Sequence, residues 1–202
     1  MALTLVTKPQ GEPLTLAQAK HQVQQATNVD DNLLSEIIIP AVRERGELAT
    51  QRAFLRQTWQ LLLDGFPASA FIDLPKPPLI SVSSVQYYDT GGTLRTLTVT
   101  TDYLVQAPAG PRCRRGRLAL PLGVVWPTAL EQMGSVIIEF VCGYGAAVDV
   151  PAALKGAMLL DVGTLYANRE DVIRGTIVAA LPRSTHDVYW SYRSHAGQRL
   201  AA

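Results

Sequence analysis

The most informative stretch of the sequence runs from Val136 to Glu170, where the spacing of apolar residues changes from that of a strand to that of a helix. Residues 136–141 form an apolar run of strand length, which the glycines of Gly143-Tyr144-Gly145 interrupt. Pro151 then favours the first turn of a helix, because its fixed φ and missing N–H suit that position. The pattern predicts a strand, a glycine turn and a helix with an apolar stripe of Leu154, Met158, Val162 and Leu165.

Two further helices are predicted near the start of the chain. Thr15 is a typical N-cap, and apolar residues from Leu16 to Ala26 follow at helical spacing. A longer helix is expected from Asn32 to about Leu55, with a kink at Pro40, which removes a backbone hydrogen bond. The two helices predict a helical hairpin over residues 1–56. Its apolar face is expected from Leu34, Ile37, Ile38, Ala41, Leu48 and Leu55.

The opposite face of the longer helix is rich in charge. Charged helix faces are most often solvated, but in an assembly of identical copies such a face would become a subunit contact of mixed charge. The candidate residues for that contact are Arg43, Glu44, Arg45 and Glu47, and Gln51 and Arg52 extend the same face.

The middle of the chain has a period of two. Short apolar runs separated by glycine and proline turns favour strands, and Thr90-Gly91-Gly92 predicts a hairpin. We therefore expect a small antiparallel β unit over residues 57–142, inserted between the helical hairpin and the helix of residues 143–170. The predicted fold class is α+β.

Residues 171–202 show no sustained period. The break at Pro182 and the polar residues that follow favour an extended arm that docks outside its own subunit through its aromatic residues. Trp and Tyr are also common at half-buried edges, so they could instead fold back and complete the apolar face of the last helix. The candidate docking residues are Tyr189, Trp190, Tyr192 and Arg193.

Composition limits the classes of partner. The formal net charge is +1 over 202 residues, so the molecule as a whole has no electrostatic preference for nucleic acid or for an anionic membrane. No apolar run is long enough to predict a membrane span. The two cysteines, Cys113 and Cys142, form neither a disulfide framework nor a metal-binding spacing and are typical of a reducing compartment.

One local patch departs from this balance. Four arginines lie between Pro111 and a predicted strand, where they form either a solvated turn or a loop that meets phosphate groups. The sequence places no aromatic residue beside them for stacking on bases. A nucleic-acid-binding module that acts through this loop is the alternative function. The residues are Arg112, Arg114, Arg115 and Arg117.

Catalysis has little support in the sequence. The histidines at 21, 186 and 195 have no acid or nucleophile motif nearby, and no phosphate-binding, zinc-protease or dinucleotide motif is present. We therefore expect no enzymatic activity, no cofactor and no bound metal. A hydrolase would require a pocket that gathers acid and base groups distant in sequence.

Several segments follow one another along most of the chain: LTLAQAKHQV, DDNLLSEIIIPAVRERGELAT, QTWQLLLDGFP, PLISVSSVQYYD, VWP, FVCGYG and VPAALKGAMLLDVGTLYANRE. In this order they resemble the head–tail connector (adaptor) proteins of long-tailed phages and gene transfer agents. The resemblance covers residues 14–170 and rests on the ordered set, since no single motif is diagnostic. Pro40 and Cys142 depart from the family pattern, which has alanine-like or other small residues at these positions.

This resemblance implies a virion assembly protein that forms a homo-oligomeric ring, commonly of about twelve subunits, beneath the portal protein. Such a ring extends the channel through which DNA passes without sequence-specific binding, and it is a platform for stopper or tail-completion proteins. The arm at 189–193 matches the segment that docks on the portal, and the arginine loop would face the channel or the next ring. The implied location is the head–tail interface of the virion, with assembly in the host cytoplasm.

Overall fold

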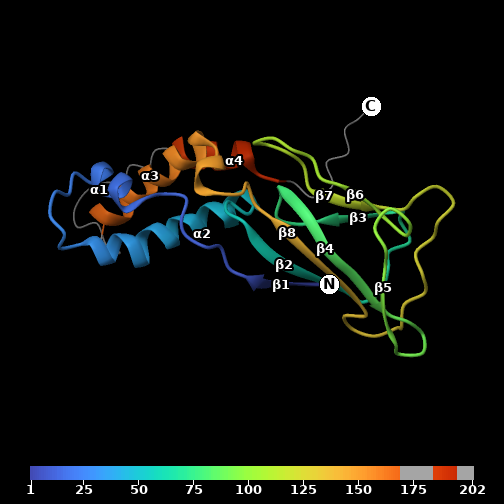
Figure 1. The fold of residues 1–202 in the computed structure, drawn as a ribbon. Coiled ribbons are helices and arrows are strands. Elements are labelled where there is room, and N and C mark those ends of the chain that lie inside the picture. Colours follow the sequence, from blue (N-terminus) through green and yellow to red (C-terminus); the bar gives the residue numbers. More distant parts are fainter. Residues whose placement is uncertain (169–183, 195–202) are drawn as a thin grey trace, which may run out of the picture.

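The computed structural model describes residues 1–168 and 184–194 of the chain. The molecule is elongated, with its helices gathered at one end and its strands at the other (Figure 1), and the predicted α+β class is confirmed. The helices are α1 (Leu16–Gln22), the π-helix η1 (Leu33–Ile38), α2 (Ile39–Thr50), the short 3-10 helix η2 (Ala147–Asp149), α3 (Ala152–Ala167) and α4 (Ser184–Tyr192). The strands are β1 (Ala2–Thr7), β2 (Gln57–Leu63), β3 (Phe71–Leu74), β4 (Leu79–Tyr88), β5 (Leu94–Thr96), β6 (Leu104–Gln106), β7 (Gly116–Ala119) and β8 (Val136–Cys142).

The strands form two antiparallel sheets, in the orders β1-β2-β8-β4-β5 and β3-β7-β6. Thr90-Gly91-Gly92 connects β4 to β5, as the hairpin prediction requires. The larger sheet extends beyond the predicted insert, because β1 comes from the start of the chain and pairs with β2. Leu61, Val85 and Ile138 are fully buried in its core.

The helices enclose a second core, in which α3 has the predicted orientation. Leu154, Met158 and Val162 are buried, whereas Leu165 at the end of the stripe is exposed. On the longer helix the buried stripe advances in steps of four residues and contains Leu34, Ile38, Val42, Gly46 and Thr50.

The predicted apolar face of the longer helix is therefore wrong at three positions. Ile37, Ala41 and Leu48 are exposed. At Leu48 the physical reason is Gly46, which allows the Phe54 ring to pack directly on the helix. A Cβ atom at Gly46 would lie 2.7 Å from Cε2 of Phe54. The helix therefore turns a glycine, not Leu48, towards the core.

A π turn directly precedes Pro40, where the sequence predicts a kink. Residue Ile39 directly after η1 donates its N–H to the carbonyl of Leu34, five residues earlier, and Pro40 lies in the first turn of α2. A π turn lengthens the hydrogen-bonded ring by one residue. Pro40 then lies in the first turn of α2, where an amide would have no partner within that helix.

The predicted glycine turn joins the helical end to the strands. Gly143 has a φ of 118°, and a Cβ atom there would lie 2.1 Å from the carbonyl oxygen of Leu55. The Gly143 amide donates to the Pro78 carbonyl (2.8 Å) and the Tyr144 amide to the Phe54 carbonyl (3.2 Å). Only glycine fits both this close approach and this backbone conformation.

Candidate interaction surfaces

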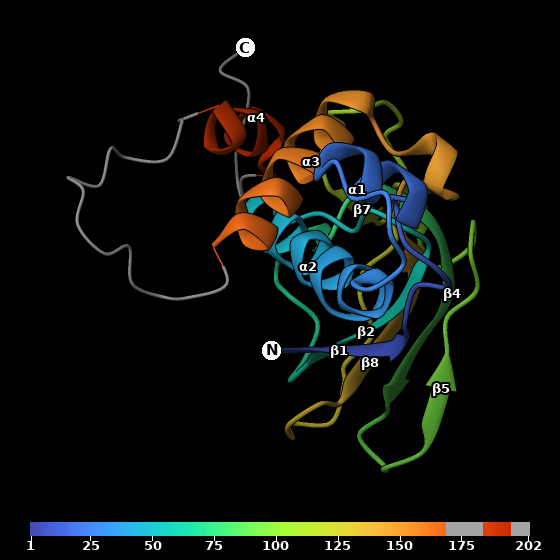
Figure 2. The same ribbon diagram turned by 90° about the vertical axis from the view of Figure 1, so that its left-hand side faces the viewer.

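The segment predicted as a docking arm is folded where the structure describes it. Residues 184–192 form α4, which packs on α3 and α2 (Figure 2). Tyr189 and Tyr192 are buried in the helical core, so for these two residues the fold-back alternative of the sequence analysis is the correct one. Trp190 and Arg193 are exposed. The rest of the predicted arm, 171–183 and 195–202, lies outside the described residues.

Tyr189 holds α4 to α3 by a buried hydrogen bond. Its hydroxyl donates to Oδ2 of Asp161 at 2.9 Å. Burial and the Asp161 carboxylate both raise the pKa of Tyr189 well above its usual value, so this hydroxyl remains a donor.

Arg52 was placed among the solvated charges by its sequence, yet it is almost completely buried. Its Nε donates to the carbonyl of Tyr192 at the end of α4, and its Nη2 donates to the carbonyl of Cys113 at 2.7 Å. The Ser194 amide also donates to the Thr50 carbonyl at 2.8 Å. Arg52 therefore connects the end of α2, the end of α4 and the arginine loop, and no local sequence signal indicates this role.

Two of the four predicted subunit-contact residues are internal. Arg43 and Glu47 are buried, and Arg43 forms ion pairs with Glu47 (3.2 Å) and with Glu12 (2.8 Å). The other oxygen of Glu47 accepts hydrogen bonds from the Phe54 amide (2.7 Å) and the Gln57 side chain (2.6 Å). This network fastens α2 to the corner where β2 begins. The prediction that Arg43 and Glu47 lie on a subunit contact face is therefore wrong, because both side chains are buried and bonded to groups of their own subunit.

The remaining two, Glu44 and Arg45, lie on an exposed side of the continuous helix formed by η1 and α2. We call this side the outer flank and define it as Ile37, Ala41, Glu44, Arg45 and Leu48. Ile37 is 60% exposed and Leu48 is 68% exposed. The residues recur at helical spacing opposite the buried stripe, so a helix side of mixed charge with two large apolar side chains is left bare.

The arginine loop is only partly available to a partner. Arg117 forms an ion pair with Asp73 (2.7 Å) and lies over the ring of Phe71, 5.2 Å from the ring centre. Arg115 is half-buried, with a buried Nε. Arg112 and Arg114 are exposed.

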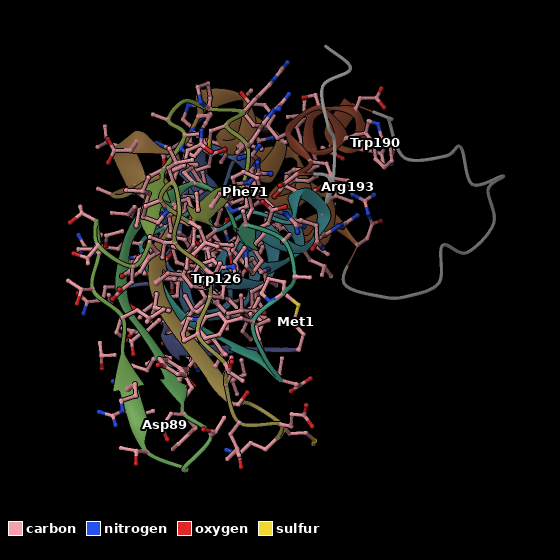
Figure 3. The ribbon with its side chains drawn as sticks, turned by 90° about the vertical axis from the view of Figure 1, so that its right-hand side faces the viewer. Met1, Phe71, Asp89, Trp126, Trp190 and Arg193 are labelled. Atoms are coloured by element: carbon pink, nitrogen blue, oxygen red, sulfur yellow. The ribbon has the colours of Figure 1, made fainter. Side chains whose placement is uncertain are left out.

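The structure brings two separately predicted groups together. Arg112 lies over the Tyr192 ring, 5.0 Å from its centre, and its Nη2 is 3.5 Å from the Ser191 hydroxyl. Beside them Trp190, 53% exposed, stacks with His186, while the Arg193 guanidinium lies 5.0 Å from the Trp190 ring centre. Figure 3 shows Trp190 of α4 and Arg193, which directly follows α4, next to each other. We call Arg112, His186, Trp190 and Arg193 the basic aromatic patch.

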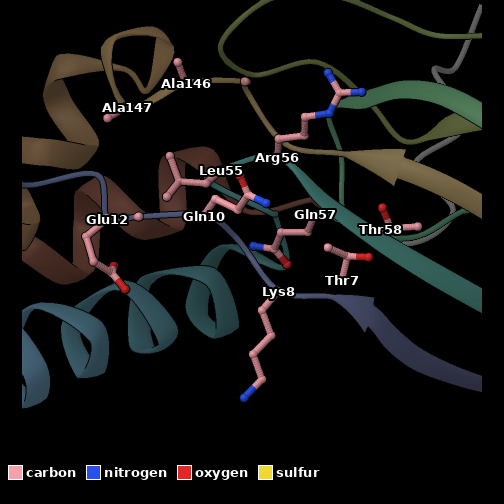
Figure 4. A pocket seen from close by; sticks show the side chains of 12 residues that line it. Thr7, Lys8, Gln10, Glu12, Leu55, Arg56, Gln57, Thr58, Ala146 and Ala147 are labelled. Atoms are coloured by element: carbon pink, nitrogen blue, oxygen red, sulfur yellow. The ribbon is translucent and has the colours of Figure 1, made fainter.

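The structure also has two pockets of moderate volume. One, of about 550 Å³, lies beside the end of β1, and its Lys8 and Arg56 side chains point to opposite sides (Figure 4). The other, of about 620 Å³, has a mostly apolar lining that includes four prolines together with Tyr144 and Tyr192. The Tyr144 hydroxyl donates to the Pro111 carbonyl at 2.6 Å, and burial raises the pKa of Tyr144 to about 12. Neither lining contains a histidine, a cysteine or a serine.

Other candidate chemistry is sparse in the part of the chain that the structure describes. His21 and His186 are exposed, and His195 lies outside that part. Residues 1–168 and 184–194 contain no group of three His, Cys, Asp or Glu side chains placed to hold a metal ion. The described helices include none that is both long and apolar enough to cross a bilayer.

Comparison with known proteins identifies relatives by fold alone. No family model matches the chain, and no curated protein sequence matches it. Three solved structures share its fold at 21% sequence identity, each covering 98% of this chain and 97% of the other. They are the virion of a native gene transfer agent particle (TM-score 0.77), the neck of an empty particle computed with C6 symmetry (0.79) and the neck of a native particle computed with C12 symmetry (0.75).

Proposed function

We propose that the protein is a non-enzymatic subunit of the neck that joins head and tail in a phage-like particle. The match over nearly the whole chain to proteins in gene transfer agent necks carries this proposal. In the role proposed, it is an adaptor that binds beneath the portal, extends the DNA channel and provides a platform for stopper or tail proteins. DNA passes without sequence-specific binding, and assembly takes place in the host cytoplasm.

The subunits are proposed to form a closed ring, as the symmetry of the related necks favours. A ring requires each copy to present two different surfaces that fit one another. The outer flank supports this role, because Ile37 and Leu48 expose apolar area on a helix that is well packed on its other side. Glu44 and Arg45 would add charge selectivity at the edge of such a contact.

The basic aromatic patch is the proposed portal contact. Trp and Arg dominate binding hot spots, and Trp190 and Arg193 are both exposed, with the Arg193 guanidinium over the Trp190 ring. Tyr189 and Tyr192 act indirectly, since they hold α4 in place from the core. Because a ring repeats the patch in every copy, weak individual contacts add up to firm attachment.

The test is a double variant, Trp190→Ala with Arg193→Ala, mixed with portal rings and examined by sedimentation. Portal binding should be lost, while the melting temperature stays close to that of the wild type because both side chains are exposed. Leu122→Ala with Arg114→Ala, exposed residues outside the patch, is the matched control. Normal portal binding by the Trp190 and Arg193 variant would rule out this contact. Truncation before α4 is a poorer test, because it also removes Tyr189 and Tyr192 from the core.

A second candidate function, nucleic-acid binding, gains from one observation. The sequence placed no aromatic residue beside the arginine loop, but the fold places the buried Tyr192 beneath Arg112, and Trp190, two residues earlier on α4, is exposed. Changing Arg112 and Arg114 to alanine should then reduce the slope of log affinity against log salt by about 2. Arg117→Ala is the control, because Arg117 is already paired with Asp73. Absence of DNA binding by the wild type at low salt would exclude this function.

A further inference from the structure

An apolar row crosses the whole larger sheet and ends at both of its borders. Leu61 on β2 lies opposite Leu3 on β1 and opposite Ile138 on β8. Ile138 lies opposite Val85 on β4, whose carbonyl accepts a hydrogen bond from the amide of Leu97 directly after β5. The three central residues are fully buried, whereas Leu3 and Leu97 are only partly buried. At each border of the sheet, the last apolar side chain of the row is therefore only partly shielded from solvent.

The backbone at both borders is open. Within residues 1–168 and 184–194, the strands β1 and β5 have a neighbouring strand on one side only (Figure 2). Because the Leu97 amide bonds to β4, alternation along the strand directs the backbone groups of Leu94 and Thr96 away from β4. The same alternation leaves every second residue of β1 with its N–H and C=O unpaired by β2.

Neither border is protected by a free charge or a proline within the strand, although β5 is only three residues long and the pairing of β1 with β2 is irregular between Leu5 and Thr7. Natural edge strands are blocked by charges, prolines or a covering loop. Residues 2–7, ALTLVT, contain no charge and no proline, and the one charge in β5, Arg95, is paired with Asp89 of the same subunit. A strand edge without a free charge or a proline is a template for another strand.

We propose that the β1 edge of one copy pairs with the β5 edge of the next, so that the sheet continues from subunit to subunit. This inference rests on the proposed ring. The occupant is a second copy because each chain carries both halves of the contact, on opposite borders of one sheet, which is the head-to-tail arrangement that closes into a ring. Leu3 of one copy and Leu97 of the next would cover one another and complete the apolar row.

The pairing would be parallel. Each strand of the sheet runs opposite to its neighbour, so β1 and β5, four steps apart in the order, run in the same direction. In the register that continues the existing rows, Ala2 lies opposite Thr96 of the next copy, because both belong to the row of Leu62, Ile137 and Gln86.

A cysteine pair tests this register directly. Ala2 and Thr96 are exposed, and opposed residues on adjacent strands have Cα atoms about 5 Å apart, which a disulfide can span. Under mild oxidation, Ala2→Cys with Thr96→Cys should give a ladder of covalent oligomers up to the full ring. Each single variant should give no ladder, and the natural cysteines are buried. Absence of a ladder from the double variant would overturn the inference.

A matched pair of substitutions at Thr96 tests the hydrogen bonds. Thr96→Pro removes an amide that the subunit itself does not use, and proline is tolerated on edge strands. It should raise the concentration needed for ring assembly at least about tenfold, because an unmade hydrogen bond leaves the opposite acceptor unpaired. Thr96→Val also loses the hydroxyl that accepts from Gln86 but keeps the amide, and it should assemble like the wild type. Equal assembly of both variants would contradict the pairing.

These results separate the inference from the proposed function. Rings that form on the portal without the disulfide ladder would refute the sheet contact and leave the adaptor role intact. A ladder from a protein that never attaches to portal rings would support the sheet contact and refute the adaptor role.

Discussion

The helical end of the molecule and its five-stranded sheet treat their polar groups in different ways. At the helical end Arg43, Glu47 and Arg52 are buried and bonded within the subunit. The sheet has an apolar interior but leaves backbone groups open at β1 and β5. The helical end therefore uses its charges to fix its own packing, whereas the sheet keeps uncharged surfaces that a second copy can complete.

The difference shows where assembly contacts are to be sought. A charged run on a helix looked like a surface for a partner, but half of that run holds the subunit together. Among the described residues, the bare surfaces that we propose as contacts are the outer flank, the basic aromatic patch and the two strand edges. Each of the following substitutions tests whether a residue stabilises its own subunit or lies on one of these surfaces.

The largest expected effect is that of Arg52→Ala. It leaves the buried carbonyls of Tyr192 and Cys113 without their donor and creates a cavity, at a cost of roughly 2–5 kcal/mol of unfolding free energy. Urea denaturation measures this loss. Arg114→Ala is the matched control and should stay within about 0.5 kcal/mol of the wild type. Equal effects of the two substitutions would show that Arg52 does not hold α4.

Next in size is Glu47→Gln, expected to cost roughly 1–3 kcal/mol because Arg43 loses its buried partner. Burial raises the pKa of Glu47 above its usual value of 4.5. The stability that this group contributes is therefore complete below pH 4.5 and is lost as the pH rises through the raised pKa.

This pH dependence provides a second readout for the same variant. Wild-type stability should fall between pH 4.5 and the raised pKa of Glu47. The fall should be smaller in Glu47→Gln, because the Glu47 carboxyl is gone. Some fall should remain, because burial also raises the pKa of Glu12. Asp64 and Asp89 affect stability at lower pH, because hydrogen bonds lower their pKa values below 3.8. An unchanged pH slope in the variant would contradict the assignment.

A smaller loss is expected for Gly46→Ala. The added methyl group would meet the Phe54 ring at 2.7 Å, while alanine favours the helix by about 1 kcal/mol, so the net cost is roughly 1 kcal/mol. Gly156→Ala, on α3 with open space around it, should instead stabilise the protein. Thermal unfolding of both variants measures the contrast, and equal shifts would show that Phe54 does not need Gly46.

The smallest effect on stability is expected for Leu48→Glu on the outer flank, within about 0.5 kcal/mol. Its effect on assembly should be large if this flank lies between subunits, because a carboxylate would be buried without a partner. Val29→Glu, which changes another highly exposed apolar residue, is the control. Normal rings from the Leu48 variant, seen by native mass spectrometry, would remove the outer flank from the subunit contact.

Local patterns predicted the elements well and the long-range contacts poorly. The strand 136–142, the turn at Gly143 and the buried side of α3 follow from neighbouring residues and were found as expected. The burial of Arg52 depends on Cys113 and Tyr192, which are distant in sequence, so no local pattern reveals it.

The C-terminal helix shows the same limit. Ser184 to Tyr192 begins with polar residues that are typical of a linker, but it forms a helix because α2 and α3 offer it an apolar surface. Tertiary packing decides this segment, since its intrinsic helix propensity is weak.

Electron microscopy of the purified protein mixed with portal rings tests the central claim most directly. The account predicts an additional ring of density, co-axial with the portal and present only when the protein is added. Portal particles that remain unchanged at saturating protein would contradict it.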